Sequence, residues 1–390
     1  MISYGRHHID EADIQAVVDC LRSGALTQGP KVAEFEQAML AYVGARYAVA
    51  VSSGTAALHI AALAAGVGPT SAVVTSPITF VASANAALYV GARPVFADVD
   101  PETTNISPSA LAETLSQNPD TKAVIPVHFA GLPCDMHAIK IIAAQAGALI
   151  IEDAAHALGS RYSDGKMVGC CAHSLMTIFS FHPVKSITTG EGGMITTNDE
   201  QIYRRLLRLR SHGINKGSDD FLNKEAAYTD GIPNPWYYEM RELSFNYRIT
   251  DIQCALGLAQ LAKLDRFVKR RRQLVARYDK AFNGLKLIQP VQMSGRDRSA
   301  HHLYPVRIDF DAAGISRAEL MNRLRGRGII SQVHYMPVPG HPYYRRLGFC
   351  PDNYPNAQAY YRQALSIPLY YDLTEEQQDT VISLLKELLL

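Results

Sequence analysis

The run Ala148-Leu-Ile-Ile-Glu-Asp-Ala-Ala-His156 begins with continuous apolar residues and ends on a carboxylate and an imidazole. An unbroken apolar run of this kind suits a strand that is buried on both faces of a parallel sheet. Asp153 follows the strand at the edge where such sheets bind their ligands. The run therefore predicts a central strand that delivers Asp153 to a ligand site. A carboxylate that only caps the next helix is the alternative.

On both sides of this run, residues 47 to 200 alternate short β-branched stretches with Ala-rich ones. This repetition predicts an α/β fold with a mostly parallel, seven-stranded sheet between helices. The predicted strands are Ala48–Ser52, Ala72–Ser76, Pro94–Ala97, Ala123–Val127, Leu149–Glu152, Leu175–Phe181 and Met194–Thr197. The helices predicted between them are Thr55–Ala65, Phe80–Val90, Pro108–Gln117 and Met136–Ala146.

The rest of the chain has a different pattern. Gly213 to Arg241 is rich in glycine and proline and holds the only tryptophan, which predicts a long, ordered and functional loop. One helix is predicted from Thr250 to Ala281, with the run Lys269-Arg-Arg-Arg272 on a solvated face. The last third predicts a smaller α/β domain that includes the segments His302–Ile308, Arg317–Arg325 and Glu375–Leu389.

Composition excludes several classes of protein. The 38 Lys and Arg residues balance 37 Asp and Glu residues, so charge gives no reason to expect nucleic acid or a membrane surface as a partner. The six scattered cysteines contain no C-x-x-C pair, which predicts no disulfides, no metal site and a reducing cytoplasm. The amino terminus lacks the apolar core of a signal peptide, so we expect a soluble protein.

The motif Ser52-Ser-Gly-Thr-Ala-Ala-Leu58 places a glycine between the end of a strand and the start of a helix. Free N–H groups and the helix dipole at such a start bind anions, and Gly54 lets the backbone approach a phosphate closely. An ordinary Ser/Thr cap on a strand–helix turn would have the same sequence. The motif therefore predicts a phosphate site without requiring one.

The run Thr177-Ile-Phe-Ser-Phe-His-Pro-Val-Lys185 delivers three polar side chains from one strand, and Gly190-Glu-Gly-Gly193 follows it. A lysine that is buried at a strand end has a lowered pKa, so its neutral amine can attack a carbonyl. Most lysines are solvated surface residues. The apolar and glycine-rich context of this one favours a reactive amine.

Together these motifs supply the three groups that pyridoxal 5′-phosphate (PLP) needs. A phosphate cradle anchors the cofactor, and Asp153 keeps the pyridine nitrogen protonated so that the ring can withdraw electrons. Lys185, 32 residues further along the chain, holds the aldehyde and moves the proton.

The chain resembles the sugar aminotransferases of the DegT/DnrJ/EryC1/StrS family, which have the PLP-dependent transferase fold of type I. The similar segments run in order through nearly the whole chain: Leu26-Thr-Gln-Gly29, Ser53-Gly-Thr-Ala-Ala-Leu58, Pro77-Ile-Thr-Phe-Val-Ala-Ser-Ala-Asn85, Pro126-Val-His-Phe-Ala-Gly131, Glu152-Asp-Ala-Ala-His156, Phe179-Ser-Phe-His-Pro-Val-Lys185, Gly190-Glu-Gly-Gly193, Ser211-His-Gly213, Asn246-Tyr-Arg-Ile-Thr-Asp-Ile-Gln253 and Gln332-Val-His-Tyr335. With this fold we expect an arm at 1–25, a large PLP-binding domain at 26–245, and a linking helix with a small C-terminal domain at 246–390.

The resemblance also implies a role for each residue of the site. The implied catalytic residues are Lys185, Asp153 and His182. The implied cofactor contacts are Gly54, Thr55, Phe80, Asp153, His156, Ser180, Lys185 and, from the neighbouring subunit of a homodimer, Asn246. The implied substrate contacts are Tyr4, Gly24, Ala25, Leu26, Thr27, Arg248, Gln332, Val333, His334 and Tyr335. Each has an ordinary structural alternative, such as a core aromatic for Phe80 or a helix cap for Asn246.

Within the family, the chain is similar to the branch that serves pseudaminic acid biosynthesis. The similar parts are Tyr4 and the segments Leu26-Thr-Gln-Gly29, Phe179-Ser-Phe-His182, His302-Leu-Tyr-Pro305 and Gly328-Ile-Ile-Ser-Gln-Val-His-Tyr335. The resemblance implies transamination of a nucleotide-linked 4-keto-6-deoxy-hexose, UDP-2-acetamido-2,6-dideoxy-β-L-arabino-hexos-4-ulose, with L-glutamate as amino donor. Another dTDP- or GDP-linked keto-sugar is the alternative. A dehydrating branch has His in place of the lysine, so Lys185 favours a transaminase.

Two alternatives come from other classes of protein. A PLP lyase on the same fold would need a reactive cysteine in a mobile glycine-rich loop, and no cysteine here lies in one. A non-catalytic regulator would carry an attached DNA-binding domain, for which 390 residues leave no room.

Overall fold

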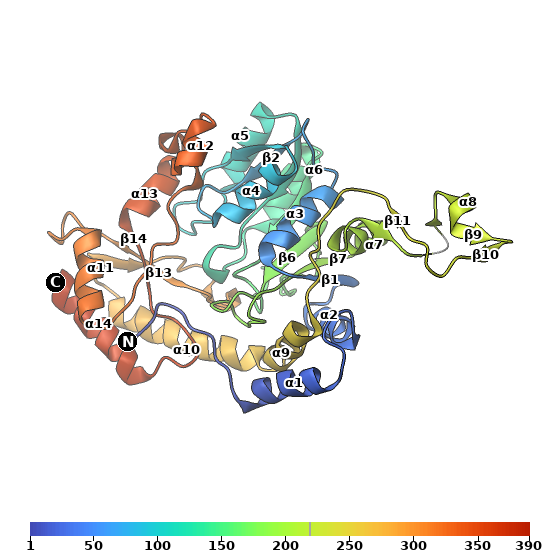
Figure 1. Cartoon of the computed structure of the whole chain (residues 1–390). Helices are drawn as coiled ribbons and strands as arrows, with labels where there is room; N and C mark the ends of the chain where they lie inside the picture. The colour runs from blue at the N-terminus through green and yellow to red at the C-terminus, as the bar shows by residue number, and fades with distance from the viewer. Residues whose placement is uncertain (218–219) are drawn as a thin grey trace.

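A seven-stranded sheet forms the centre of the structure, a computed structural model that describes residues 1–217 and 220–390 (Figure 1). Its strand order is β1-β7-β6-β5-β4-β2-β3. The strands are β1 (Tyr47–Val51), β2 (Ala72–Thr75), β3 (Arg93–Phe96), β4 (Thr121–Ile125), β5 (Leu149–Asp153), β6 (Met176–Ser180) and β7 (Gly193–Thr197). Only β7 runs antiparallel to its neighbours, so the carboxyl ends of the other strands share one edge. The predicted mostly parallel sheet is confirmed.

Both faces of this sheet are buried. Ala50 and Ile150 belong to one apolar cluster, whereas their neighbours Val49 and Ile151 belong to the cluster on the other face. Successive side chains of a strand point to opposite faces, so an unbroken apolar run is what such a strand requires.

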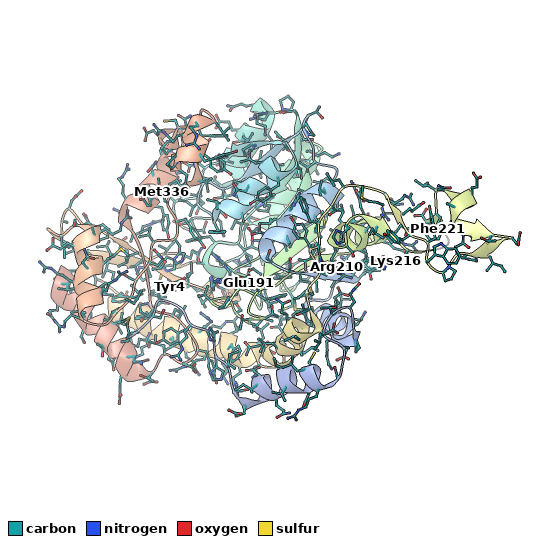
Figure 2. The ribbon with its side chains drawn as sticks, viewed as in Figure 1. Tyr4, Glu191, Arg210, Lys216, Phe221 and Met336 are labelled. Atoms are coloured by element: carbon teal, nitrogen blue, oxygen red, sulfur yellow. The ribbon has the colours of Figure 1, made fainter. Side chains whose placement is uncertain are left out.

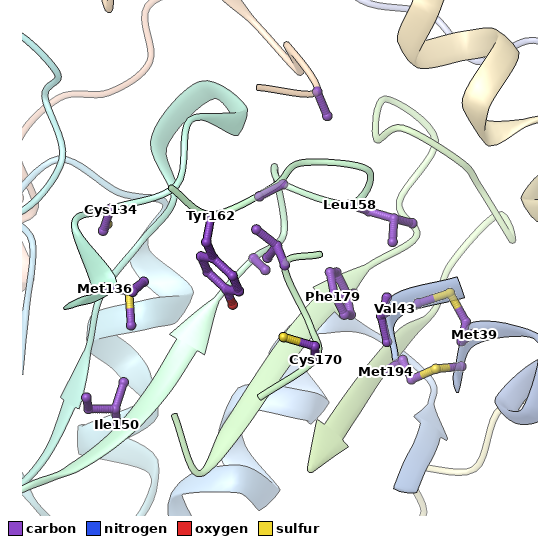
Figure 3. Packing of buried hydrophobic residues seen from close by; sticks show 14 of the residues in the cluster. Met39, Val43, Cys134, Met136, Ile150, Leu158, Tyr162, Cys170, Phe179 and Met194 are labelled. Atoms are coloured by element: carbon purple, nitrogen blue, oxygen red, sulfur yellow. The ribbon is translucent and has the colours of Figure 1, made fainter. Parts of the chain in front are cut away.

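Helices pack against both faces of the sheet and complete the two apolar clusters. One face packs against α2 (Pro30–Val43), α5 (Pro108–Gln117) and α6 (Met136–Gln145), and Figure 3 shows this packing around Phe179. The opposite face packs against α3 (Gly54–Ala64), α4 (Val81–Tyr89) and α7 (Glu200–Arg210). The predicted helices between the strands are present, with ends that differ by a residue or so.

A second, three-stranded antiparallel sheet follows in the last third of the chain, where the sequence predicts a smaller α/β domain. It has the order β12 (Ile288–Pro290), β13 (Tyr304–Ile308) and β14 (Ala364–Ile367), and it shares a separate apolar cluster with nearby helices. The helices of this part are α11 (Arg317–Gly326), α12 (Pro342–Arg346), α13 (Pro355–Gln363) and α14 (Glu375–Leu389).

The predicted single helix from Thr250 to Ala281 is wrong, because the chain forms α9 (Asp251–Leu261) and α10 (Leu264–Phe282) with a break between them. At the break, the Lys263 amine lies 2.7 Å from Asp10 Oδ1 and 2.6 Å from Asp13 Oδ2, where Asp13 is fully buried. Asp13 lies in α1 (Glu11–Arg22), which packs on α9 and makes the predicted arm partly helical. The tertiary ion pairs outweigh the local helical pattern here.

The prediction of a solvated face for Lys269-Arg-Arg-Arg272 is wrong for Arg271, whose guanidinium is buried. Arg271 Nη1 donates to the carbonyls of His301, His302 and Leu369 at 3.3, 3.2 and 2.9 Å. These carbonyls accept hydrogen bonds from the guanidinium and so offset the cost of burying its charge. The run of four basic residues gives no sign that one of them is buried.

The predicted loop from Gly213 to Arg241 contains short elements: β8 (Ile214–Asn215), α8 (Lys224–Ala227), β9 (Tyr228–Thr229), β10 (Ile232–Pro233) and β11 (Glu239–Met240). In Figure 1, α8, β9 and β10 project from the body of the molecule. Several apolar side chains are exposed along this segment, among them Leu222, Ile232, Trp236, Tyr238 and Met240. In the described part of the chain, no helix is long and apolar enough to cross a membrane.

Candidate active site

A cavity of about 430 Å³ lies beside the carboxyl ends of β5 and β6. Figure 2 labels Tyr4 and Glu191, which come from distant parts of the sequence and both line it. Its lining includes these predicted site residues: Tyr4, Gly54, Thr55, Phe80, Asp153, His156, Ser180, His182, Lys185, His334 and Tyr335. The fold therefore brings together side chains that are separated by up to 331 positions.

Asp153, the last residue of β5, is buried and held by two donors. Ser83 Oγ donates to its Oδ2 at 2.6 Å, and the backbone N–H of Ala155 donates to its Oδ1 at 3.1 Å. Thr79 Oγ1 lies 2.7 Å from Ser83 Oγ and donates to it, since Ser83 gives its own proton to Asp153. Charge-assisted bonds of this kind fix the direction in which the carboxylate points.

Lys185 lies five residues after the end of β6 and lines the same cavity. Within the described residues, its amine makes no hydrogen bond or ion pair. Burial lowers the pKa of Lys185 to about 8, against the opposing attraction of Asp153. An amine with this pKa is partly neutral near pH 8 and can act as a nucleophile or a base.

The start of α3 forms a cradle next to Ser180. Ser53 caps the helix, and its hydroxyl accepts from the Ala56 N–H at 3.0 Å. A Cβ at Gly54 would lie 2.9 Å from the Cβ of Ser180, so only glycine fits without a shift. Backbone N–H groups at this helix start, together with the Ser180 hydroxyl, suit a phosphate group.

Imidazoles and aromatic rings form the opposite wall. His156 Nε2 lies 3.2 Å from the Tyr335 hydroxyl, whereas its Nδ1 is buried and has no partner among the described residues. His334 Nδ1 lies 2.9 Å from Ser366 Oγ, and burial lowers the pKa of His334 to about 3. Burial and the nearby Lys185 amine also hold the pKa of His156 well below its ordinary value, so both rings are neutral.

Phe80 is 58% exposed although it is a large apolar residue at the start of α4. Its ring lies 6.4 Å from the ring of Tyr335 across the cavity, and the ring of Tyr4 lies 5.3 Å from that of His334. An exposed aromatic face at a cavity offers apolar contact to a flat ligand.

Eight predicted site residues lie outside the lining of this cavity: Gly24, Ala25, Leu26, Thr27, Asn246, Arg248, Gln332 and Val333. Residues 24–27 approach the start of α9, where the Asp251 N–H donates to the Leu26 carbonyl at 3.0 Å. Arg248 lines a separate cavity of about 370 Å³ together with Glu36 and Arg210. Their roles in a site remain predictions.

Sequence reasoning missed Thr79, Ser83, Glu191 and His302. Ser83 lies inside the similar segment 77–85, but its bond to Asp153 joins residues 70 positions apart and has no local signal. His302 lies in the similar segment 302–305, and only the packing of the chain brings its ring to the cavity.

These residues fit PLP. The start of α3 and Ser180 line the cavity where a phosphate would lie, and Asp153 presents a carboxylate to the same cavity. Among the described residues, the Lys185 amine has no protein partner and the buried His156 Nδ1 is unpaired. The donor set matches the phosphate, the ring nitrogen and the aldehyde of the cofactor. Such a site at the carboxyl edge of this sheet, with a smaller α/β unit after it, is that of a fold-type I PLP enzyme.

The chain belongs to the DegT/DnrJ/EryC1/StrS aminotransferase family, whose sequence model matches residues 7–386. It is a PLP-dependent sugar aminotransferase, and solved structures similar to it include a PLP-form and a PMP-form. The alternative of a cysteine-dependent lyase finds no support, since none of the six free cysteines lines the cavity.

Relatives of known name span the chain. The spore coat polysaccharide biosynthesis protein SpsC of Bacillus subtilis is 40% identical over 99% of this chain and 97% of its own length. The UDP-4-amino-4,6-dideoxy-N-acetyl-β-L-altrosamine transaminase of Campylobacter jejuni is 37% identical over 99% and 98%. The structure of Helicobacter pylori PseC, an aminotransferase of pseudaminic acid biosynthesis, superposes with a TM-score of 0.89 at 30% identity and covers 100% of this chain and 99% of PseC.

Proposed function

We propose that this chain transfers the amino group of L-glutamate to the C4 carbonyl of a nucleotide-linked 4-keto-6-deoxy-hexose. The observation that carries this proposal is the free Lys185 amine in the cavity that also holds Asp153 and the Gly54 cradle. We propose UDP-2-acetamido-2,6-dideoxy-β-L-arabino-hexos-4-ulose as the particular sugar, in pseudaminic acid biosynthesis. The names of the Campylobacter jejuni and Helicobacter pylori relatives support this choice.

Bound PLP supplies an electron sink that stabilises negative charge on the carbon next to the reacting nitrogen. Lys185 would hold the cofactor covalently in the resting enzyme, and the amino group of glutamate would displace it from that bond. The freed Lys185 amine then takes the proton from the α-carbon of glutamate, and in the second half of the reaction it delivers a proton at C4 of the sugar. An amine whose pKa lies near 8 can do both, because neither its neutral form nor its charged form is rare near that pH. The Ser83 bond keeps the Asp153 carboxylate aimed at the pyridine nitrogen.

The remaining cofactor contacts divide by chemistry. Gly54, Thr55 and Ser180 bind the phosphate at the start of α3. His156 would lie beside the ring hydroxyl, and Phe80 would cover one face of the ring; both residues line the cavity. Asn246 is exposed and lies outside the cavity of its own chain, so we propose that Asn246 of the partner subunit completes the phosphate site in a homodimer.

The sugar nucleotide meets the outer part of the cavity, where Tyr4, His182, His334 and Tyr335 offer hydrogen-bonding groups. Residues 24–27, Arg248, Gln332 and Val333 contact it from the rim or from the second subunit. We place the reaction in the cytoplasm, where a protein with six free cysteines stays reduced.

A dTDP- or GDP-linked keto-sugar is the second candidate. The relative SpsC, at 40% identity, is named for spore coat polysaccharide biosynthesis and not for pseudaminic acid. The shape of the outer cavity decides between bases and ring configurations, and both candidates use the same inner residues.

The test is a panel of UDP-, dTDP- and GDP-linked 4-keto-6-deoxy-hexoses, each incubated with the holoenzyme and 15N-labelled glutamate. We expect labelled amino sugar from the UDP-linked 2-acetamido substrate, detected by mass spectrometry, and 2-oxoglutarate in equal amount. Amination of only a dTDP- or GDP-linked sugar would replace the first candidate with the second. No amino transfer to any sugar would refute the proposed function.

A further inference from the structure

His302 lies on the inner wall of the cavity and has no part in the function proposed so far. Its ring centroid is 4.3 Å from that of His156, with 40° between the two planes. His302 is 4% exposed and His156 is 6% exposed. The two rings are therefore in direct contact, and little solvent reaches either of them.

The backbone of His302 is held from two sides. Its N–H donates to the Ala130 carbonyl at 2.9 Å, and its carbonyl accepts from the buried Arg271 guanidinium at 3.2 Å. The same guanidinium donates to the Leu369 carbonyl at 2.9 Å. Arg271 therefore ties together the segments that contain His302 and Leu369. A side chain on such a backbone has little freedom to move away from His156.

Gly131 makes the approach of these segments possible. Its φ is +104°, and a Cβ there would lie 3.0 Å from the His156 carbonyl and 3.1 Å from the His302 nitrogen. Ser160 joins the same segments, because its hydroxyl donates to the Gly131 carbonyl at 2.6 Å and accepts from the Ala300 N–H at 2.8 Å. The contact between the two imidazoles is thus built by three separate segments of the chain.

On its other side, His156 faces Tyr335. The rings are close to parallel at 19°, and the Tyr335 hydroxyl lies 3.2 Å from His156 Nε2. Among the described residues, Nδ1 of His156 and Nδ1 of His302 are both buried and unpaired. An imidazole that packs against one ring, is hydrogen-bonded to the hydroxyl of a second and keeps an unpaired nitrogen is preorganised for a ligand.

We propose that His302 is a positioning residue, whose ring holds the His156 imidazole in place beside the ring hydroxyl of bound PLP. This inference rests on the proposed function, in which His156 lies next to that hydroxyl. His302 acts by packing and not by charge. Burial and its neighbours His156 and Lys185 hold the pKa of His302 well below its ordinary value, so the ring is neutral.

The adjacent His301 offers a matched control. Its side chain is also buried, but it lines a separate small cavity with Arg296 and Ser299. Its φ of +50° lies in the left-handed region that asparagine tolerates, so His301→Asn is a mild change there. We compare His302→Asn, which removes the ring, with His302→Phe, which keeps a ring without nitrogens, and with His301→Asn.

Two measurements on the holoenzymes test the proposal: the pH midpoint of the absorption change of bound PLP, and the rate of PLP release on dialysis. A misplaced His156 no longer stabilises the charged ring oxygen. We therefore expect His302→Asn to move the pH midpoint of the PLP absorption change by about one unit and to speed PLP release about tenfold. A shift of about one pH unit and a roughly tenfold change in rate correspond to similar free energies. We expect His302→Phe and His301→Asn to stay close to the wild type in both.

The melting temperatures of the variants show whether a substitution acts on the position of His156 or on the stability of the whole fold. A His302→Asn protein that melts lower but keeps the wild-type midpoint and release rate would overturn the proposal. A folded His302→Phe protein as impaired as His302→Asn would also overturn it, because the nitrogens and not the ring would then matter. Wild-type protein that shows no absorption from bound PLP would refute the proposed function itself, before any variant is compared.

Discussion

Ser83 Oγ lies 2.6 Å from Asp153 Oδ2 and joins helix α4 to the end of strand β5 beneath the cavity. The two residues are 70 positions apart, and both are buried. Within residues 1–217 and 220–390, the Asp153 carboxylate accepts only one other hydrogen bond, from the Ala155 N–H. The Ser83 hydroxyl therefore determines how one oxygen of this carboxylate points.

Removing this hydroxyl should weaken the enzyme without unfolding it. A hydrogen bond to a charged group contributes about 1.5 to 3 kcal/mol, so Ser83→Ala should lower kcat/KM by about tenfold to a hundredfold. Steady-state kinetics with glutamate and the sugar substrate measure the effect. The control is Ser116→Ala on the exposed side of α5, which should match the wild type. Equal kinetics in both variants would show that Ser83 does not orient Asp153.

Lys185 should carry the cofactor. Borohydride reduction of the holoenzyme, followed by digestion and mass spectrometry, should place a pyridoxyl group on the peptide that contains Lys185. Lys185→Ala should still bind PLP, without a covalent bond, and should lose at least about three powers of ten in turnover, as expected when the proton-transferring group is removed. Lys166→Ala is the control, because Lys166 is exposed and pairs with Asp164. A label on another lysine would contradict the assignment.

Gly54→Ala should weaken PLP binding because of the close approach of Ser180. The added Cβ would lie 2.9 Å from the Cβ of Ser180, so the start of α3 or the strand end must shift. We expect the dissociation constant of PLP to rise about tenfold or more, which corresponds to about 1.4 kcal/mol. Gly68→Ala is the control, since nothing lies within 4 Å of a Cβ at Gly68. Fluorescence titration of the apoenzymes measures both.

The lowered pKa of Lys185 predicts that the stability of the apoenzyme depends on pH. Burial lowers this pKa from 10.5 to about 8, so between these values the unfolded chain binds more protons than the folded chain. Stability from this group therefore rises with pH through that window, and below pH 8 the buried charge destabilises the fold. We expect apo Lys185→Met to be more stable than the wild type at pH 7 by about 1 to 3 kcal/mol.

The advantage of Lys185→Met should shrink as the pH rises from about 8 to 10.5, because above this range the lysine is neutral in the folded and in the unfolded chain. Urea unfolding of the two apoenzymes at several pH values measures the difference, and other titrating groups cancel in the comparison. An advantage that stays constant from pH 7 to pH 10 would show that burial does not perturb Lys185.

Much of the central sheet was predictable, because the burial of a strand determines which of its consecutive residues are apolar. The run from Ala148 to Ile151 is apolar at every position, since β5 has helices on both faces. The ends of this strand and of β6 place Asp153 and Lys185, and both motifs predicted that placement. The resemblance to a family predicted the other cofactor contacts, and the comparisons confirm that family.

Other features had no local signature. The break between α9 and α10 follows from the pairing of Lys263 with Asp10 and Asp13, which are about 250 positions away. The burial of Arg271 follows from three carbonyls on other segments. Neither is visible in a helical pattern, because a pattern records which residues are apolar and not which distant groups meet them.

The amino-acid sequence by itself determined the strands and helices, the edge of the sheet at which the cavity lies, and the lysine and carboxylate that line it. Each depends on the order of neighbouring residues, and hydrophobic burial and backbone geometry act on that order directly. Only the tertiary structure decided that Ser83 holds Asp153 and that His302 packs on His156. Such contacts join segments that are far apart in the chain, and their geometry exists only once the two sheets and their helices have packed.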